Sequence, residues 1–157
     1  MGQIILIEQV QEITKLKHLG KTLVLAGGCF DILHAGHIEF LKKAKNLGDY
    51  LIILLESDEN IKKLKGKNRP INNVFDRATI LANLKMIDYV IPLKPLKNDD
   101  DYTSIVKMIE PDIIAVTHGD PLIEIKENQA KQVNAKVVVL PKKENYSTSI
   151  IAKRFKK

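Results

Sequence analysis

The sequence contains few aromatic residues: Phe and Tyr make up 5% of its 157 residues, and Trp is absent. Proteins that bind single-stranded nucleic acid interleave basic residues with aromatic side chains on which the bases stack. Such a surface is hard to build here. The net charge of +6 favours anionic partners but does not choose among phosphates, nucleic acid and membranes. We therefore expect no nucleic-acid partner, because that function would rest on charge alone.

The chain has one cysteine, Cys29, which excludes an intramolecular disulfide and a multi-cysteine zinc site. A single cysteine fits a reducing compartment, and we expect a cytoplasmic protein. The N-terminal segment carries Glu8 and Glu12 and has no long hydrophobic run, so it resembles neither a signal peptide nor a membrane span. We expect no membrane partner.

One domain is predicted over residues 1–157, because the length suits a single core and 45% of the residues are hydrophobic. Short apolar runs alternate with stretches of helical periodicity, which predicts an α/β fold with a doubly wound parallel sheet of about five strands. Gly48 is expected to cap the second helix in a left-handed conformation. The expected strands are 21–26, 50–56, 89–91, 113–117 and 136–140. The expected helices are a short one that ends near residue 20, then 36–47, 74–84, 103–109 and 122–133.

The segment between the first strand and the next helix, residues 27–37, combines glycines with two histidines. Ligands of open α/β sheets bind at the carboxyl ends of the strands, where helix N-termini favour anions. His34 and His37 stand three residues apart, so both rings can face one ligand. Gly28 would let the backbone approach that ligand, and Gly36 would leave room beside the rings. A phosphate suits these features, although two histidines that merely cap or pack remain the alternative. Zinc would lack a convincing third ligand.

A second polar stretch, residues 57–73, follows the second strand. It holds five cations, a glycine and a proline. A solvated surface loop is one interpretation, and a mobile phosphate clamp is the other. The five cations are Lys62, Lys63, Lys65, Lys67 and Arg69.

These segments resemble a known family. GGCFDILHAGH (residues 27–37) resembles the signature Gly-x-Phe-Asp-x-x-His-x-Gly-His of the cytidylyltransferase-like nucleotidyltransferases. LKGKNRP (residues 64–70) resembles a stretch of the heptose-1-phosphate adenylyltransferase branch. ENYSTSI (residues 144–150) is similar to the closing Ser-Thr-Thr-x-Ile element, with Ser149 in place of the second Thr. The chain departs from that branch at residues 26–28, where it has Ala-Gly-Gly for Thr-Asn-Gly, and at residues 117–120, where it has Thr-His-Gly-Asp for Lys-Gly-Gly-Asp.

The resemblance implies a Rossmann-like fold and an enzyme that joins a nucleoside triphosphate to a phosphorylated small molecule and releases pyrophosphate. The leading hypothesis is transfer from ATP to a sugar 1-phosphate, in particular a heptose 1-phosphate, to give an ADP-sugar. The alternatives are a CTP-dependent enzyme acting on glycerol 3-phosphate or a similar alcohol phosphate, and a nucleotide-binding module without catalysis. Mg²⁺ is expected to arrive with the triphosphate and to be held mainly by phosphate oxygens, so no protein ligand is named. The sequence does not decide whether the protein forms a homodimer.

The resemblance also implies roles for individual residues. An acceptor phosphate is already ionised, so the protein needs no general base and must align the groups and neutralise charge. His34, His37 and Lys65 are the expected catalytic residues. The residues expected at the nucleotide are Gly28, Cys29, Phe30, Asp31, Gly36, Arg69, Asp120, Ser147 and Thr148.

Simpler interpretations stand beside several of these roles. Asp31 is expected to orient its loop through hydrogen bonds. Arg77 matches a family arginine that contacts phosphate, and Lys94 lies at the sheet edge, so both are expected to bind substrate; exposed basic side chains are the alternative. For Cys29 the alternative is a small buried filler. For Ser147 and Thr148 it is a plain helix N-cap, which is compatible with holding phosphate.

Overall fold

The computed structural model describes residues 1–142 and residue 151. Within them, six strands form one sheet in the order β1-β4-β3-β2-β5-β6, and every neighbouring pair is parallel. The strands are β1 (Gln3–Ile4), β2 (Leu23–Gly28), β3 (Tyr50–Leu55), β4 (Tyr89–Pro92), β5 (Ile113–Thr117) and β6 (Lys136–Leu140). The helices are the 3₁₀ turn η1 (Ile7–Gln9), α1 (Gln11–His18), α2 (Ala35–Lys45), α3 (Asp58–Lys65), α4 (Val74–Ala82), α5 (Asp99–Ile109) and α6 (Ile123–Gln132).

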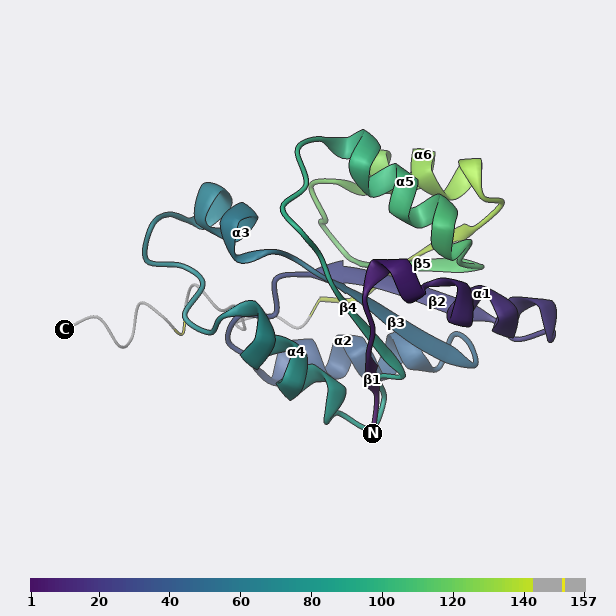
Figure 1. The fold of residues 1–157 in the computed structure, drawn as a ribbon, viewed down its shortest axis with the longest axis horizontal. Helices are drawn as coiled ribbons and strands as arrows, with labels where there is room; N and C mark the ends of the chain where they lie inside the picture. The colour runs from purple at the N-terminus through teal and green to yellow at the C-terminus, as the bar shows by residue number, and fades with distance from the viewer. Residues whose placement is uncertain (143–150, 152–157) are drawn as a thin grey trace.

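Helices cover both faces of the sheet (Figure 1). α2 and α4 pack on one face, where Leu41 and Leu81 join a core cluster with Val24 of β2. α1, α5 and α6 pack on the other face, where Ile13 and Ile109 join a second cluster. The central strands are therefore buried on both sides, which explains why they read as nearly continuous apolar runs. This arrangement confirms the predicted α/β Rossmann-like sheet.

All five predicted strands are present, and the sixth, β1, was not predicted. β1 has two residues, both exposed, and pairs with β4 at the edge of the sheet. A strand this short carries no period-2 pattern that could reveal it. α5 begins at Asp99, four residues before the predicted start, because the Asn98 side chain accepts a hydrogen bond from the Asp101 amide and caps the helix.

The sequence pattern suggested a loop for the basic stretch after β3. The first half of this stretch instead forms the helix α3. The Ser57 side chain caps the helix by accepting a hydrogen bond from the Asn60 amide. Among its residues only Asn60 and Ile61 are buried, so α3 has almost no apolar face that periodicity could detect. Figure 1 shows α3 standing away from the sheet, with extended segments on either side of it.

Gly48 is not the left-handed cap that we expected. α2 ends at Lys45, and the next residue, Asn46, has right-handed helical dihedral angles. A Cβ atom at Gly48 would lie 2.8 Å from the Val24 side chain and 2.9 Å from the Thr22 carbonyl oxygen. Gly48 is therefore small because the turn into β3 passes close to the start of β2.

Candidate active site

A cleft of about 270 Å³ opens at the carboxyl ends of β2 and β5, beside the N-terminus of α2. The end of β2 with the segment after it, the start of α2 and the end of β5 supply most of its walls, and Lys65 at the end of α3 also contributes. The structure brings eight of the predicted site residues to this cleft. They are Gly28, Cys29, Phe30, His34, Gly36, His37, Lys65 and Asp120.

The two histidines stack on each other at the entrance to α2. Their ring centroids lie 3.8 Å apart with the planes 21° from parallel. His34 is the N-cap residue of α2, and its Nδ1 accepts a hydrogen bond of 3.4 Å from the His37 amide. A neutral His34 therefore carries its proton on Nε2, where it can donate to a ligand. Capping and ligand binding are thus compatible for this residue.

His37 is desolvated beside the cleft. Burial, with smaller contributions from His34 and Lys65, lowers the pKa of His37 to about 4. Burial also lowers the pKa of His34. Both rings are therefore neutral near pH 7 in the ligand-free protein, and the positive potential at this point comes from the N-terminus of α2 and from Lys65. The first turn of α2 has no acidic residue to compensate its dipole.

The lowered pKa of His37 predicts a loss of stability in acid. As the pH falls, the unfolded chain takes up a proton on this ring near pH 6.5, whereas the folded protein does so only near pH 4. The free energy of unfolding should therefore decrease through this window. We expect His37→Gln, which does not titrate, to show a smaller decrease between about pH 7 and about pH 5, measured by urea unfolding. His18→Gln, at an exposed position of α1, is the control and should keep the wild-type decrease. An equal decrease in His37→Gln would contradict the desolvation of this ring.

Gly28 lines the cleft, and its small size also has a structural reason within the protein. A Cβ atom at Gly28 would lie 2.8 Å from the Phe30 ring, so this glycine makes room for an aromatic side chain of the protein itself. Phe30 is buried, has a positive φ of 44°, and places its ring centroid 5.2 Å from that of His37. The space left by Gly28 therefore lets the Phe30 ring pack against the ring of His37. Burial raises the pKa of the half-buried Cys29 thiol, which keeps it protonated at neutral pH.

The Asp31 carboxylate is buried and ties the first loop to the segment after α3. It accepts hydrogen bonds from Arg69 Nε (2.6 Å), the Ile71 amide (2.8 Å) and the Asn72 amide (3.0 Å). Burial alone would raise the pKa of Asp31, but these three donors outweigh it and lower the pKa. Asp31 thus has the orienting role that the sequence suggested. Arg69 lies in the same contact, and its Nη2 is buried without a hydrogen-bond partner among the described residues.

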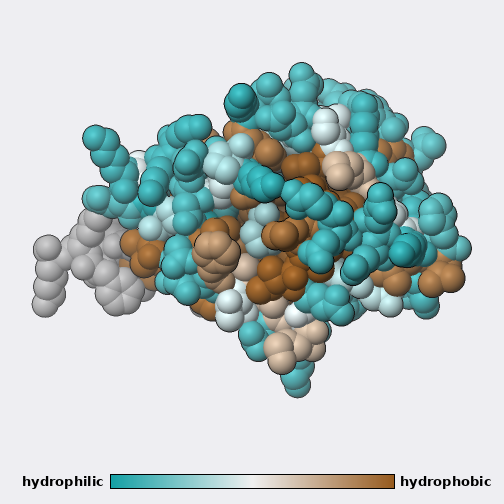
Figure 2. Space-filling view, in the orientation of Figure 1, coloured by the Kyte–Doolittle hydropathy of each residue, from teal (hydrophilic) through white to brown (hydrophobic). Residues whose placement is uncertain are grey.

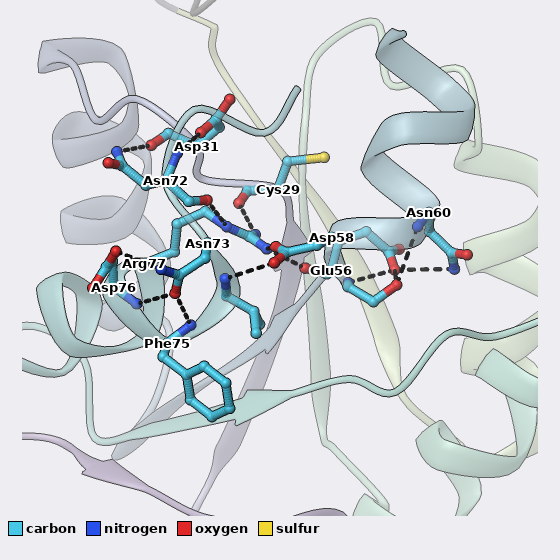
Figure 3. A network of polar contacts seen from close by, with 12 residues as sticks. Cys29, Asp31, Glu56, Asp58, Asn60, Asn72, Asn73, Phe75, Asp76 and Arg77 are labelled. Atoms are coloured by element: carbon cyan, nitrogen blue, oxygen red, sulfur yellow. Dashed lines mark hydrogen bonds and ion pairs between the residues drawn. The ribbon is translucent and has the colours of Figure 1, made fainter. Parts of the chain in front are cut away.

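Arg77 is buried rather than exposed, and all three nitrogens of its guanidinium donate hydrogen bonds to the protein (Figure 3). Nε donates to the Asn72 carbonyl oxygen and Nη1 to that of Cys29, at 3.0 and 2.6 Å. Nη2 donates to the Glu56 carbonyl oxygen at 2.8 Å and to the Asp58 carboxylate at 2.6 Å. Arg77 therefore ties α4 to three other segments, and it does not line the cleft in which a phosphate would bind.

Of the remaining predicted residues, Lys94 does not line the described cleft. Lys94 is 77% exposed and forms an ion pair of 2.7 Å with Glu8, as the alternative of an exposed lysine suggested. Ser147 and Thr148 lie outside the described residues, so their expected roles remain predictions. Within residues 1–142, no group of three His, Cys, Asp or Glu side chains has the arrangement of a metal site.

Lys126 of α6 is a cleft residue that sequence reasoning missed. Its Nζ lies 2.5 Å from the Asp120 carboxylate, and both side chains are largely buried. The Asp120 carboxylate also accepts a hydrogen bond from the Leu122 amide at 2.9 Å. Nothing in the local sequence marks Lys126, because its pairing depends on how α6 follows the turn after β5. Lys142 adds another cation to the wall.

Lys126→Ala should weaken triphosphate binding, because it leaves the Asp120 charge uncompensated in a cleft that must receive an anion. We expect a rise of about tenfold in the Kd for ATP, measured by titration calorimetry. The same change at exposed Lys107 of α5 is the control and should leave the Kd unaltered. Adding Asp120→Asn to Lys126→Ala should restore most of the affinity. A Kd unaffected by Lys126→Ala would show that the pair lies outside the triphosphate site.

The sequence profile of a known protein family, described as Cytidylyltransferase-like, matches residues 25–154 of this chain. The chain belongs to the cytidylyltransferase-like family. It is therefore a nucleotidyltransferase by family, and the resemblance drawn from its motifs is confirmed. No helix among the described residues is long and apolar enough to span a membrane.

Two similar curated proteins are longer than this chain. It is 41% identical over 150 residues to the bifunctional protein HldE of a Nitratiruptor species, covering 95% of this chain and 31% of the relative. It is 42% identical over 147 residues to the bifunctional protein HldE of Helicobacter hepaticus, covering 93% and 29% respectively. The chain thus spans about three tenths of the length of these curated relatives.

Two solved structures have a similar fold. The lipopolysaccharide core biosynthesis protein from Thermoplasma volcanium aligns with a TM-score of 0.64 and 29% identity, covering 82% of this chain and all of that one. The pantoate-beta-alanine ligase from Francisella tularensis, complexed with beta-gamma ATP and beta-alanine, aligns with a TM-score of 0.66 and 16% identity, covering 92% and 69%. At that identity the second likeness concerns the fold alone.

Proposed function

We propose that this protein transfers the nucleotidyl group of ATP to a sugar 1-phosphate, in particular a heptose 1-phosphate, and gives an ADP-sugar and pyrophosphate. The observation that carries the proposal is the stacked pair His34 and His37 at the N-terminus of α2, facing a cleft with Lys65 in its wall. The choice of acceptor is supported by residues 64–70, which resemble the heptose branch, and by the relatives named bifunctional protein HldE.

The proposed reaction is an in-line displacement at the α-phosphorus. An oxygen of the acceptor phosphate forms a bond to this phosphorus while the bond to the oxygen bridging the α- and β-phosphates breaks. The electron pair of the broken bond leaves with pyrophosphate. The attacking oxygen is already ionised, so the residues of the cleft act by alignment and by electrostatic stabilisation. The groups that face the phosphate oxygens in this proposal are the rings of His34 and His37, the first amides of α2 and Lys65.

Mg²⁺ enters this proposal as part of the substrate. The described residues supply no three-ligand group for a resident metal, and the one carboxylate among the cleft residues, Asp120, is already paired with Lys126. The metal would neutralise phosphate charge on the triphosphate itself.

A second candidate is a cytidylyltransferase that uses CTP and an alcohol phosphate such as glycerol 3-phosphate. The chain's departures at residues 26–28 and 117–120, both close to the cleft, favour keeping this candidate. A nucleotide-binding module without catalysis is disfavoured, because the His-x-Gly-His element is intact and its two rings are stacked at the cleft.

The experiment is a matrix of MgATP and MgCTP against heptose 1-phosphate, other sugar 1-phosphates and glycerol 3-phosphate, with pyrophosphate release followed continuously. We expect the highest kcat/KM with ATP and a sugar 1-phosphate. Turnover confined to CTP would replace the proposal by the cytidylyltransferase. Tight nucleotide binding without pyrophosphate from any pair would favour the binding module.

A further inference from the structure

α3 is weakly anchored for a helix that carries a proposed catalytic residue. Lys65 is its last residue and reaches the wall of the cleft. Only Ile61 gives the helix a fully buried apolar side chain, while the other buried residue, Asn60, is polar. Figure 2 shows the surface of the molecule around this region as mostly hydrophilic. Hydrophobic burial therefore contributes little to fixing this helix, and its position depends mainly on hydrogen bonds.

A polar cluster of three side chains supplies these bonds, and we call Glu56, Asn60 and Tyr102 the α3 clamp. The Tyr102 hydroxyl of α5 donates to Glu56 Oε2 at 2.5 Å. Asn60 Nδ2 lies 3.1 Å from Glu56 Oε1 and 3.2 Å from the Tyr102 hydroxyl oxygen. Asn60 Nδ2 also lies 3.2 Å from the Leu96 carbonyl oxygen, so the clamp joins α3 to the segment before α5.

The clamp holds one side of α3 while Arg77 holds the other. Asp58, in the first turn of α3, pairs with Arg77. Glu56 links the two sides, because its carboxylate belongs to the clamp and its carbonyl oxygen accepts from Arg77 Nη2. Figure 3 shows Asn60 and Glu56 on one side of Asp58 and the Arg77 side chain on the other. α3 is therefore fixed near its N-terminus, which leaves the position of Lys65 dependent on that anchorage.

We propose that Tyr102 is a positioning residue for Lys65: its hydroxyl, acting through Glu56 and Asn60, sets the orientation of α3 and so places the Lys65 ammonium group at the cleft. The inference rests on the proposed function, in which Lys65 contacts the phosphates. Tyr102 itself is absent from the walls of the described cleft and makes its hydrogen bonds on α3 and the end of β3.

The test is a double-mutant cycle between Tyr102→Phe and Lys65→Ala, read as kcat for pyrophosphate release at saturating substrates. Tyr102→Phe alone should lower kcat by about tenfold, because a small displacement of a catalytic group is costly. In the Lys65→Ala background the same change should have no further effect. Tyr50→Phe, at the opposite end of β3, is the matched control and should leave kcat unchanged. Unchanged kcat in Tyr102→Phe, or an equal loss in both backgrounds, would overturn the proposal.

Amide hydrogen exchange separates this proposal from the proposed function. Tyr102→Phe should speed exchange in residues 58–66 while the amides of β2 and β3 keep their wild-type protection. Tyr50→Phe should leave residues 58–66 unchanged. Unchanged exchange there in Tyr102→Phe would overturn the clamp even in an active enzyme. A wild-type protein that releases no pyrophosphate would instead contradict the proposed function, and the exchange result would still decide whether Tyr102 orients α3.

Discussion

Replacing His37 by alanine is expected to lower kcat for pyrophosphate release by about 10²–10³, the usual effect of losing one preorganised electrostatic donor. His37 stacks on His34 at the N-terminus of α2 and lines the cleft, so its loss removes a cleft group and the support of its partner ring. The thermal midpoint should change little, because His37 is only partly buried. Steady-state kinetics and a thermal melt of the same preparation check both expectations.

Two variants define what a loss of activity in His37→Ala means. His34→Ala should give a loss of the same order, because this ring donates from Nε2 and also caps α2. His18→Ala, at an exposed position of α1, should retain wild-type kcat. Near-normal turnover in His37→Ala would contradict the proposed mechanism. A large fall in the thermal midpoint would show instead that the ring mainly supports the fold.

Arg77→Leu is expected to have the largest effect on stability, lowering the free energy of unfolding by about 3–5 kcal/mol. The substitution leaves the Asp58 carboxylate and the carbonyl oxygens of Cys29, Glu56 and Asn72 without their common donor. Buried acceptors that lose a partner cost more than the deleted bond itself was worth. Urea unfolding monitored by circular dichroism measures the change.

Two control variants show whether the loss of stability in Arg77→Leu comes from its hydrogen bonds or from the loss of any positive charge. Lys85→Leu removes a cation at an exposed position just after α4 and should cost less than about 0.5 kcal/mol. Arg77→Lys should give an intermediate loss, since one ammonium group cannot reach all four acceptors. A loss below about 1 kcal/mol in Arg77→Leu would mean that the hydrogen bonds around Arg77 contribute little to the stability of the fold.

Features with a local sequence signal were predicted well. The central strands are continuous apolar runs because the sheet is covered on both faces, and residues 27–37 form one uninterrupted motif that stays together in space. This motif predicted His34 and His37 as cleft residues, whereas Lys65, which also lines the cleft, was predicted from the family resemblance of residues 64–70. The loop-orienting role of Asp31 followed from the same motif.

Features that depend on distant segments were not predicted. The four acceptors of Arg77 come from residues 29, 56, 58 and 72, so neither its burial nor its role shows in the pattern of its own helix. α3 escaped detection because polar contacts, rather than an apolar stripe, hold it in place. Lys126 meets Asp120 only once the turn after β5 has formed. In each case tertiary contacts decide what the local pattern cannot.

The most direct test of the central claim, nucleotidyl transfer in this cleft, is the stoichiometry of pyrophosphate and ADP-sugar formed from MgATP and heptose 1-phosphate. The account predicts one pyrophosphate for each ADP-sugar, no release above background without the acceptor, and a loss of both products in His37→Ala. Pyrophosphate that forms equally well without an acceptor, or the absence of acceptor-dependent pyrophosphate with every triphosphate tried, would contradict it.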